Sequence, residues 1–192
     1  MRYPEYAEVN GKKYKINTDF RVAIKCNEIA NDNTISDFER ALAVIYTLFG
    51  EEGINSQDDH EKLLELAKKY LLCDKEYIET NEEPDMDYAE DMDYIEASFM
   101  SDYNIDLENE KMHWWKFSKL INGLSNSELG DCCVLNRVRN LRNINTKEIK
   151  DPKEKQKMEE TKQRVALKKN RKYATKEQEE NANEILKDLG LL

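Results

Sequence analysis

The sequence has few of the residues that end secondary-structure elements: 192 residues contain 6 glycines and 3 prolines. An all-β domain needs a turn roughly every ten residues, so this scarcity disfavours one. No apolar run approaches the roughly 18 residues of a membrane span. The N-terminus also lacks the apolar segment of a signal peptide. These absences predict a mostly helical, soluble, intracellular protein.

Metal ligands and catalytic motifs are also scarce. No two cysteines have Cys-x-x-Cys spacing, and the two histidines are far apart in the chain. The acidic run 85–93 lacks the glycine that a calcium-binding EF-hand loop requires. There is no glycine-rich phosphate loop and no Gly-x-Ser-x-Gly elbow. We therefore expect a protein that is not an enzyme and has no metal or cofactor. The residues concerned are Cys26, Cys73, Cys132, Cys133, His60 and His113.

Charge is abundant but unevenly distributed. Residues 1–50 are neutral, residues 51–110 carry a net charge of −17, and residues 111–192 carry +7. An acidic chain is repelled by phosphates, which disfavours nucleic acid as a partner unless the basic third acts alone. With 39% hydrophobic and 36% charged residues, the chain can form a core, but not along its whole length.

The first fifty residues predict a hairpin followed by two helices. Two strand-like segments, 6–9 and 12–16, flank Asn10-Gly11, a dipeptide typical of a type I′ turn. Asp19 is placed to cap a helix that runs to about Ala30, with Phe20, Ile24 and Ile29 inward.

A capping box then opens the second of these helices. Ser36 and Glu39 have the spacing at which each side chain bonds the other residue's backbone amide. The helix that follows is apolar nearly all round and ends at Gly50, so we expect a fully buried central helix. Its apolar residues are Phe38, Ala41, Leu42, Val44, Ile45, Leu48 and Phe49.

Four further helices follow from apolar periodicity. The expected ranges are 58–72, 87–102, 110–122, and a last one from Ser125 or Ser127 to about residue 140. The acidic stretch 79–87 contains Pro84 and is expected to be a loop. In the helix over 87–102, one stripe faces inward: Tyr88, Met92, Ile95 and Phe99. We thus predict a compact helical domain of about six helices over residues 1–145.

The composition changes after residue 145. Asp151-Pro152 is a strong helix start, but residues 151–172 contain few apolar side chains. We predict a second region, 146–192, as a charged, partly flexible helical extension whose last helix begins near Thr175. Its end carries Leu189, Leu191 and Leu192. These leucines are either a docking peptide or a frayed end.

The segment 113–117, His-Trp-Trp-Lys-Phe, is called the tryptophan segment below. At 100° per residue, Trp114, Phe117 and Leu120 share one face of a helix, whereas Trp115 lies nearly opposite. Two interpretations of Trp115 remain open. It covers a neighbouring element such as the hairpin, or it is an anchor at an interface, where tryptophan is enriched.

Several segments together resemble the bacteriophage gene-product-fifteen family. They are 94–99, 103–107, 112–117 and 120–124, and residues 18–21 are similar to the family's start. The resemblance covers about residues 10 to 145. The positions at the centre of this motif are Tyr94, Phe99, Ile105, Trp114, Phe117 and Leu120.

The resemblance implies a role in phage morphogenesis. Family members come from long-tailed phages and prophages, and their genes lie beside the tape-measure gene. They are taken to be tail-assembly proteins, chaperones that hold the long helical tape-measure protein before tail-tube subunits polymerise on it. The resemblance also implies that the protein has no catalytic residues and that it is located in the cytoplasm of the bacterial host. Candidate contacts with tape-measure or other tail proteins are Trp115 and the C-terminal leucines, and the oligomeric state is left open.

Other classes of function remain as alternatives. Residues 51–110 have the charge of a DNA mimic that would bind and block a host or phage protein. Regulation of transcription is a further reading, since Arg137, Arg139 and Arg142 are placed to meet phosphates. The third alternative is an enzyme, but the sequence contains no set of residues that would converge on one catalytic site.

Overall fold

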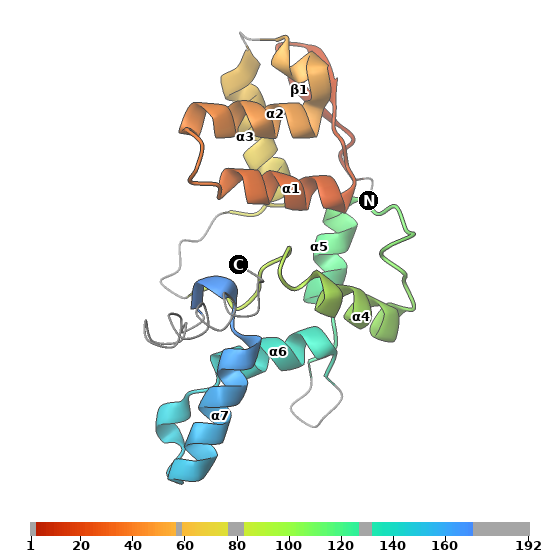
Figure 1. Ribbon diagram of the computed structural model, residues 1–192. Coiled ribbons are helices and arrows are strands. Elements are labelled where there is room, and N and C mark those ends of the chain that lie inside the picture. Colours follow the sequence, from red (N-terminus) through yellow and green to blue (C-terminus); the bar gives the residue numbers. More distant parts are fainter. Residues whose placement is uncertain (1–2, 57–58, 77–82, 127–131, 171–192) are drawn as a thin grey trace, which may run out of the picture. The chain divides into compact units, whose positions relative to one another are not determined.

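The computed structural model describes residues 3–56, 59–76, 83–126 and 132–170 (Figure 1). These residues are mostly helical, with seven α-helices and a short antiparallel hairpin, which confirms the predicted fold class. Contacts between Cα atoms group residues 1–137 and 138–192 into two units, each described below by itself. The domain boundary predicted after residue 145 stays a prediction.

The hairpin has the predicted turn. Strands β1 (Tyr6–Val9) and β2 (Lys12–Lys15) pair antiparallel. Asn10 and Gly11 have φ angles of 52° and 80°, the two positive values that a type I′ turn requires. Alternate side chains point inward and are buried, and β1 packs on α3 while β2 packs on α2. The buried side chains are Ala7, Val9 and Tyr14.

Helix α1 (Phe20–Ala30) begins where its cap predicts. The Asp19 carboxylate accepts a hydrogen bond from the backbone N–H of Arg21 at 2.9 Å. Phe20 and Ile24 are buried as expected, and Ile29 is half-buried. This face packs against α2 and α5.

Helix α2 (Asp37–Ile54) begins with the predicted capping box but does not end at Gly50. Gly50 has a φ of 69° and kinks the helix, which then continues for one more turn. A glycine adopts this backbone conformation without strain. In the added turn Gly53 lies against Phe49, where a Cβ atom would come within 2.8 Å of the phenylalanine Cβ.

The expected burial of α2 on all sides is wrong. Val44, Ile45 and Leu48 are buried, but Phe38 is 69% exposed and Tyr46 is 56% exposed. Helices α1 and α3 (His60–Leu71) pack on α2. The part of the α2 surface that these two helices cover is narrower than the part that carries apolar side chains.

Helix α4 (Met92–Tyr103) is shorter than predicted. The Asp87 carboxylate accepts hydrogen bonds from the backbone N–H groups of Ala89 and Glu90, both at 2.9 Å. Asp87 therefore holds a turn over residues 88–91 instead of starting the helix. Within the expected stripe, Ile95 and Phe99 are buried, whereas Tyr88 and Met92 are half-buried.

Helices α5 (Trp114–Asn122) and α6 (Val134–Asn143) also begin later than expected. Ser125 does not open α6, because its backbone is used elsewhere. Its N–H donates to the Asp102 carboxylate at 2.7 Å, and its carbonyl accepts from Cys133 N–H at 3.1 Å. Ser127, the other expected start, lies outside the described residues.

The second unit contains η2 (Thr146–Glu148), α7 (Pro152–Val165) and η3 (Lys168–Asn170). Asp151 caps α7 as predicted, accepting from the N–H groups of Lys153 at 2.8 Å and Glu154 at 2.9 Å. No residue of α7 is buried. Arg142 and Lys162 donate to backbone carbonyls within this unit. The helix expected from Thr175 lies outside the described residues.

Candidate partner-binding site

The tryptophan segment starts with a histidine cap. Nδ1 of His113 accepts a hydrogen bond from the backbone N–H of Trp115 at 3.0 Å, so α5 begins at Trp114 and not near residue 110 as expected. Because Nδ1 accepts, the ring proton is on Nε2, which donates to the Pro4 carbonyl at 3.0 Å. His113 is therefore a structural cap that also holds the N-terminal segment.

The backbone around His113 is joined to the start of α1. Phe20 N–H donates to the Met112 carbonyl at 3.0 Å, and Trp114 N–H donates to the Thr18 carbonyl at 2.8 Å. Asp19 and His113 thus form an isolated antiparallel bridge. Two segments that carry the family resemblance, far apart in the sequence, are in direct contact.

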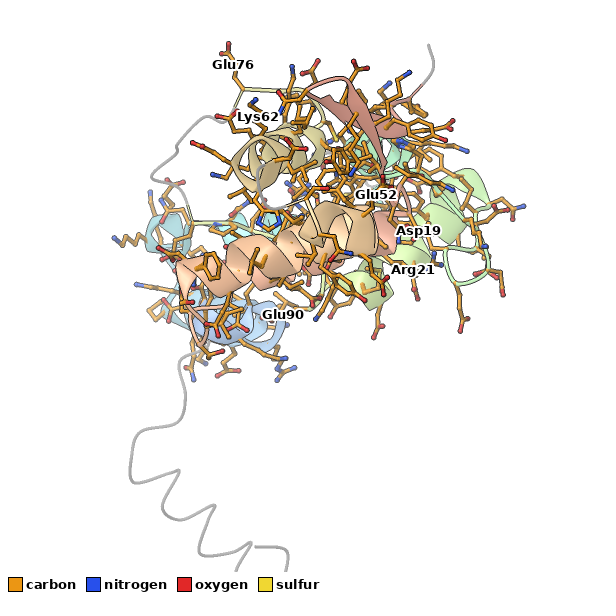
Figure 2. The ribbon with its side chains drawn as sticks, turned by 90° about the horizontal axis from the view of Figure 1, so that it is seen from above. Asp19, Arg21, Glu52, Lys62, Glu76 and Glu90 are labelled. Carbon is orange, nitrogen blue, oxygen red and sulfur yellow. The ribbon has the colours of Figure 1, made fainter. Side chains whose placement is uncertain are left out.

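Arg21 strengthens the same junction. Its guanidinium donates to the carbonyls of Leu107, Glu108 and Glu110, the last two at 3.1 and 3.3 Å. The Asp19 carboxylate lies 3.2 Å from the same guanidinium (Figure 2). These carbonyls belong to a non-helical connector, so they need donors from elsewhere. The planar fork of arginine can supply several at once.

Both indoles hold the end of α3. Trp114 Nε1 donates to the Leu71 carbonyl and Trp115 Nε1 donates to the Tyr70 carbonyl, each at 2.9 Å. The last four carbonyls of a helix have no partner within it. Adjacent tryptophans on different faces of α5 therefore satisfy adjacent carbonyls at the end of α3.

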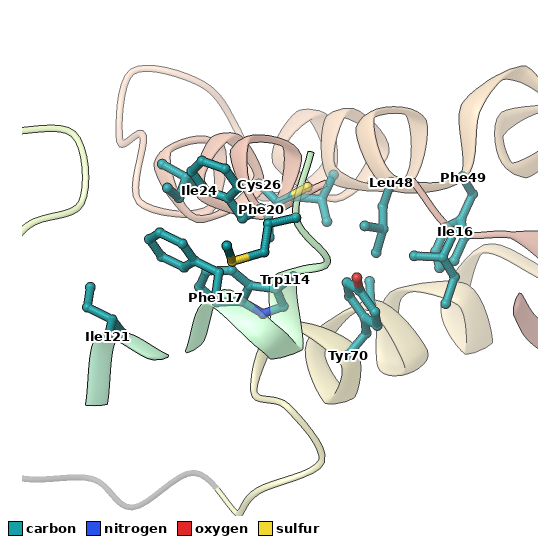
Figure 3. Packing of buried hydrophobic residues seen from close by; sticks show 14 of the residues in the cluster. Ile16, Phe20, Ile24, Cys26, Leu48, Phe49, Tyr70, Trp114, Phe117 and Ile121 are labelled. Carbon is teal, nitrogen blue, oxygen red and sulfur yellow. The ribbon is translucent and has the colours of Figure 1, made fainter. Parts of the chain in front are cut away.

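An aromatic stack that includes Phe20, Phe117 and Trp114 lies beside this junction (Figure 3). The ring of Phe117 is parallel to those of Phe20 and Phe99, with centroid distances of 4.5 and 5.2 Å. Trp114 stacks on Phe117 at 5.8 Å. Of the six predicted motif positions, three are fully buried and three are half-buried against the same core. The buried ones are Phe99, Trp114 and Phe117; the half-buried ones are Tyr94, Ile105 and Leu120.

Trp115 lies beside a small cavity. Its ring is half-buried and stacks on Tyr70 at 6.1 Å, with an angle of 29° between the planes. The cavity measures about 210 Å³ and is mostly apolar. An ion pair of 3.2 Å between Lys69 and Asp74 lies at its edge. The other lining residues are Pro4, Tyr6, Ala7, Ile16 and Leu66.

This cavity has the size and chemistry to take one apolar side chain. Its lining joins the hairpin to α3 and α5, so Trp115 does cover neighbouring elements. Tyr6, one of the lining residues, is 55% exposed and is therefore accessible to a partner. The two interpretations of Trp115 are therefore compatible, and its role as a partner contact stays a prediction.

Burial favours the neutral forms of two titratable groups in the core, Cys26 and Tyr70. Burial raises the pKa of the Cys26 thiol to about 12 and raises the pKa of Cys73. Burial also raises the pKa of the Tyr70 hydroxyl, which has no hydrogen-bond partner among the described residues. At neutral pH neither Cys26 nor Tyr70 is an ionised nucleophile. Cys132 and Cys133 are free, the first half-buried and the second buried.

Two features of the site were missed in the sequence. The capping bond of His113 is local, but histidine is not among the preferred N-cap residues, so the sequence did not indicate it. The outward position of Tyr6 did have a local signal, because the strand alternation that buries Ala7 and Val9 turns Tyr6 to the other face. The C-terminal contacts predicted at Leu189, Leu191 and Leu192 lie outside the described residues.

The described part of the chain lacks two kinds of structural feature. It contains no group of three or more His, Cys, Asp or Glu side chains that are placed to hold a metal ion. None of its helices is long and apolar enough to span a bilayer.

Comparison with known proteins identifies one family. The model of the family described as Bacteriophage Gp15 protein matches residues 2–167, which is most of the chain. The match includes the hairpin, helices α1 to α7 and the tryptophan segment. No curated protein and no solved structure matches the chain.

Proposed function

The chain belongs to the Bacteriophage Gp15 protein family, and we propose that it is a phage tail-assembly protein. In this proposal it is a chaperone or accessory factor that binds the tape-measure or tail-tube protein in the cytoplasm of the bacterial host. It acts by binding and catalyses no reaction. The observation that carries the proposal is the family match over residues 2–167.

The arrangement of unit 1 supports a binding role. Its recognisable residues form a stable junction, in which the polar groups of His113, Trp114 and Trp115 bond to other elements. The cavity beside Trp115 opens next to the exposed Tyr6 ring. A rigid body with a small apolar recess suits the capture of a side chain from a partner.

The direct test is co-purification from cells that express the phage tail genes. The tagged full-length chain should retain the tape-measure protein or the tail-tube protein, and should not retain the major capsid protein of the same phage. Deleting the gene from an inducible prophage should yield particles with absent or malformed tails. Normal tails in the deletion strain would contradict the proposal.

The cavity needs variants that separate binding from folding. Trp115→Ala would remove a hydrogen bond and a stacked ring from the core, so a loss of binding would be ambiguous. Tyr6→Ala changes a mostly exposed side chain at the rim and should leave the unfolding midpoint unchanged. If the cavity binds the client, Tyr6→Ala should lower its recovery, and equal recovery would argue against this cavity.

The DNA-mimic alternative receives less support from the described residues. Helix α3 lies within the acidic third, yet it contains Lys62, Lys68 and Lys69 beside two glutamates. The carboxylates of this region are therefore interrupted by positive charge. Strongly salt-dependent binding to a DNA-binding protein would favour the alternative over the tail-assembly role.

A further inference from the structure

The outer face of α2 carries the most exposed large apolar side chains of the described residues. Phe38 is 69% exposed and Tyr46 is 56% exposed, ahead of Tyr6 at 55% and Met100 at 45%. Leu42, half-buried, lies between the two in the sequence. The three residues are at positions i, i+4 and i+8 of one helix, so they form a single ridge. This set is called the α2 ridge below.

The exposure of the ridge does not result from fraying at the end of the helix. Ser36 and Glu39 fix the first turn of α2 through the capping box, and Arg40 donates to the Asp32 and Ile35 carbonyls. The backbone that presents Phe38 is therefore held by several hydrogen bonds. A contiguous row of apolar side chains on a well-held helix face is typical of an interaction surface.

Carboxylates lie at both ends of the ridge. Asp37 and Glu39 are in the first turn of α2, and Glu51 and Glu52 are in its last turns. Hydrogen bonds from Ser36 lower the pKa of Glu39, so this carboxylate is ionised at neutral pH. Arg40 is the basic residue of α2, and its charge is engaged by Asp37. At the other end, Lys12 of the hairpin lies 3.7 Å from Glu52. Arg40 and Lys12 each offset one carboxylate, so each end of the ridge keeps one net negative charge beside its apolar length.

A hollow lies beside Tyr46. It measures about 710 Å³, and its lining includes Val22 of α1, Tyr46 and Thr47 of α2, and Lys15 of the hairpin. Side chains of a second element that lay along the ridge would find room there. The exposed ridge and the adjoining hollow together have the shape of a binding site for an elongated structural element of a partner.

We propose that the α2 ridge binds an amphipathic helix of a partner protein. The apolar stripe of that helix covers Phe38, Leu42 and Tyr46, and lysine or arginine residues beside its stripe meet the carboxylates at the two ends. The proposal rests on the proposed function, because the partner is the helical client of the assembly protein, and it names the surface that this client contacts.

A second copy of the chain fits the ridge less well. Two α2 helices packed in parallel would place Asp37 and Glu39 against their own copies. Packed antiparallel, they would place the same residues against Glu51 and Glu52. Arg40 and Lys12 offset only one carboxylate at each end, so both arrangements still oppose ends of net negative charge, which costs binding energy. A helix with basic flanks meets no such repulsion.

The test compares full-length variants by their affinity for tape-measure fragments. Phe38→Ala and Tyr46→Ala should each weaken binding about tenfold, as expected for aromatic anchors at an interface. Met100→Ala removes a similarly exposed apolar side chain from α4 and is the matched control. Glu51→Lys should weaken binding several-fold, and this effect should shrink as the salt concentration rises. Unfolding midpoints measured in parallel exclude loss of folding.

The outcomes separate this inference from the proposed function. If the wild type binds the client and Phe38→Ala binds equally well, the inference is overturned and the proposed function stands. A wild type that retains no tail protein overturns the proposed function first. A third outcome is that the wild type sediments as a dimer while the Phe38→Ala variant sediments as a monomer. This result would show that the ridge binds a second copy of the chain, and it would overturn the inference.

Discussion

Helices α5 and α2 both present aromatic side chains on more than one face, but the fold uses them differently. On α5, Trp114 and Trp115 lie on different faces, and each indole N–H bonds to a carbonyl of α3. On α2, Phe38 and Tyr46 lie outside the arc that α1 and α3 cover. The tryptophan segment is therefore a junction within the protein, and the α2 ridge is surface.

The difference shows that a recognisable motif need not be the contact surface. The residues that carry the family resemblance meet one another: Asp19 bridges His113, and Arg21 holds the connector before α5. Others of these residues, among them Phe99, Trp114 and Phe117, are buried in the hydrophobic core. The most exposed large apolar side chains among the described residues are instead on a helix whose composition had suggested complete burial.

The largest expected effect separates two phenylalanines. Phe117→Ala removes a ring that is 0% exposed and stacked on Phe20, and should destabilise the protein by about 3–5 kcal/mol. Phe38→Ala makes the same chemical change on the surface and should alter the free energy of unfolding by no more than about 0.5 kcal/mol. Urea denaturation of both variants measures the difference. Similar losses at the two positions would remove the contrast between core and ridge.

A smaller effect is expected at the junction between α1 and the connector. Arg21→Lys keeps the charge but loses the fork that reaches the carbonyls of Glu108 and Glu110. We expect a loss of about 1–3 kcal/mol, because hydrogen bonds from a charged group are lost and carbonyls are left without them. Lys25→Arg, on the exposed side of α1, is the control and should leave the unfolding midpoint unchanged.

The two tryptophans should differ from each other. Trp114→Phe removes a fully buried indole and its hydrogen bond to the Leu71 carbonyl, at a cost of about 1–3 kcal/mol. Trp115→Phe should cost about 1 kcal/mol or less, because the Tyr70 carbonyl still accepts a hydrogen bond from Cys73 N–H. Thermal unfolding of the two variants gives the comparison. A greater loss at Trp115 would show that its ring is the more important packing element.

The smallest expected effect is a pH dependence at the start of α2. Hydrogen bonds from Ser36 lower the pKa of Glu39 in the folded state, so its carboxylate stabilises the fold above the unfolded pKa of about 4.3. This contribution is lost as the pH falls through the folded pKa. The stability difference between wild type and Glu39→Gln should therefore be present at pH 7 and should shrink below about pH 4. Denaturation at several pH values tests this, and a constant difference would contradict it.

Sequence by itself determined the features that depend on neighbouring residues. The Asn10-Gly11 turn, the Asp19 and Asp151 caps and the Ser36–Glu39 capping box all appear as predicted, since each is formed by groups within four positions of one another. The mostly helical class followed from the same local signals, and the family resemblance from residues that could be read directly.

Only the tertiary structure decided which group the second ring nitrogen of His113 binds and which side of α2 is covered. His113 caps α5 while its other nitrogen bonds to Pro4, more than a hundred positions away in the chain. The exposure of Phe38 depends on how much of α2 its neighbours α1 and α3 reach, and no local pattern contains that information. Periodicity shows which side chains are apolar, but the extent of the packed neighbours determines which of them are buried.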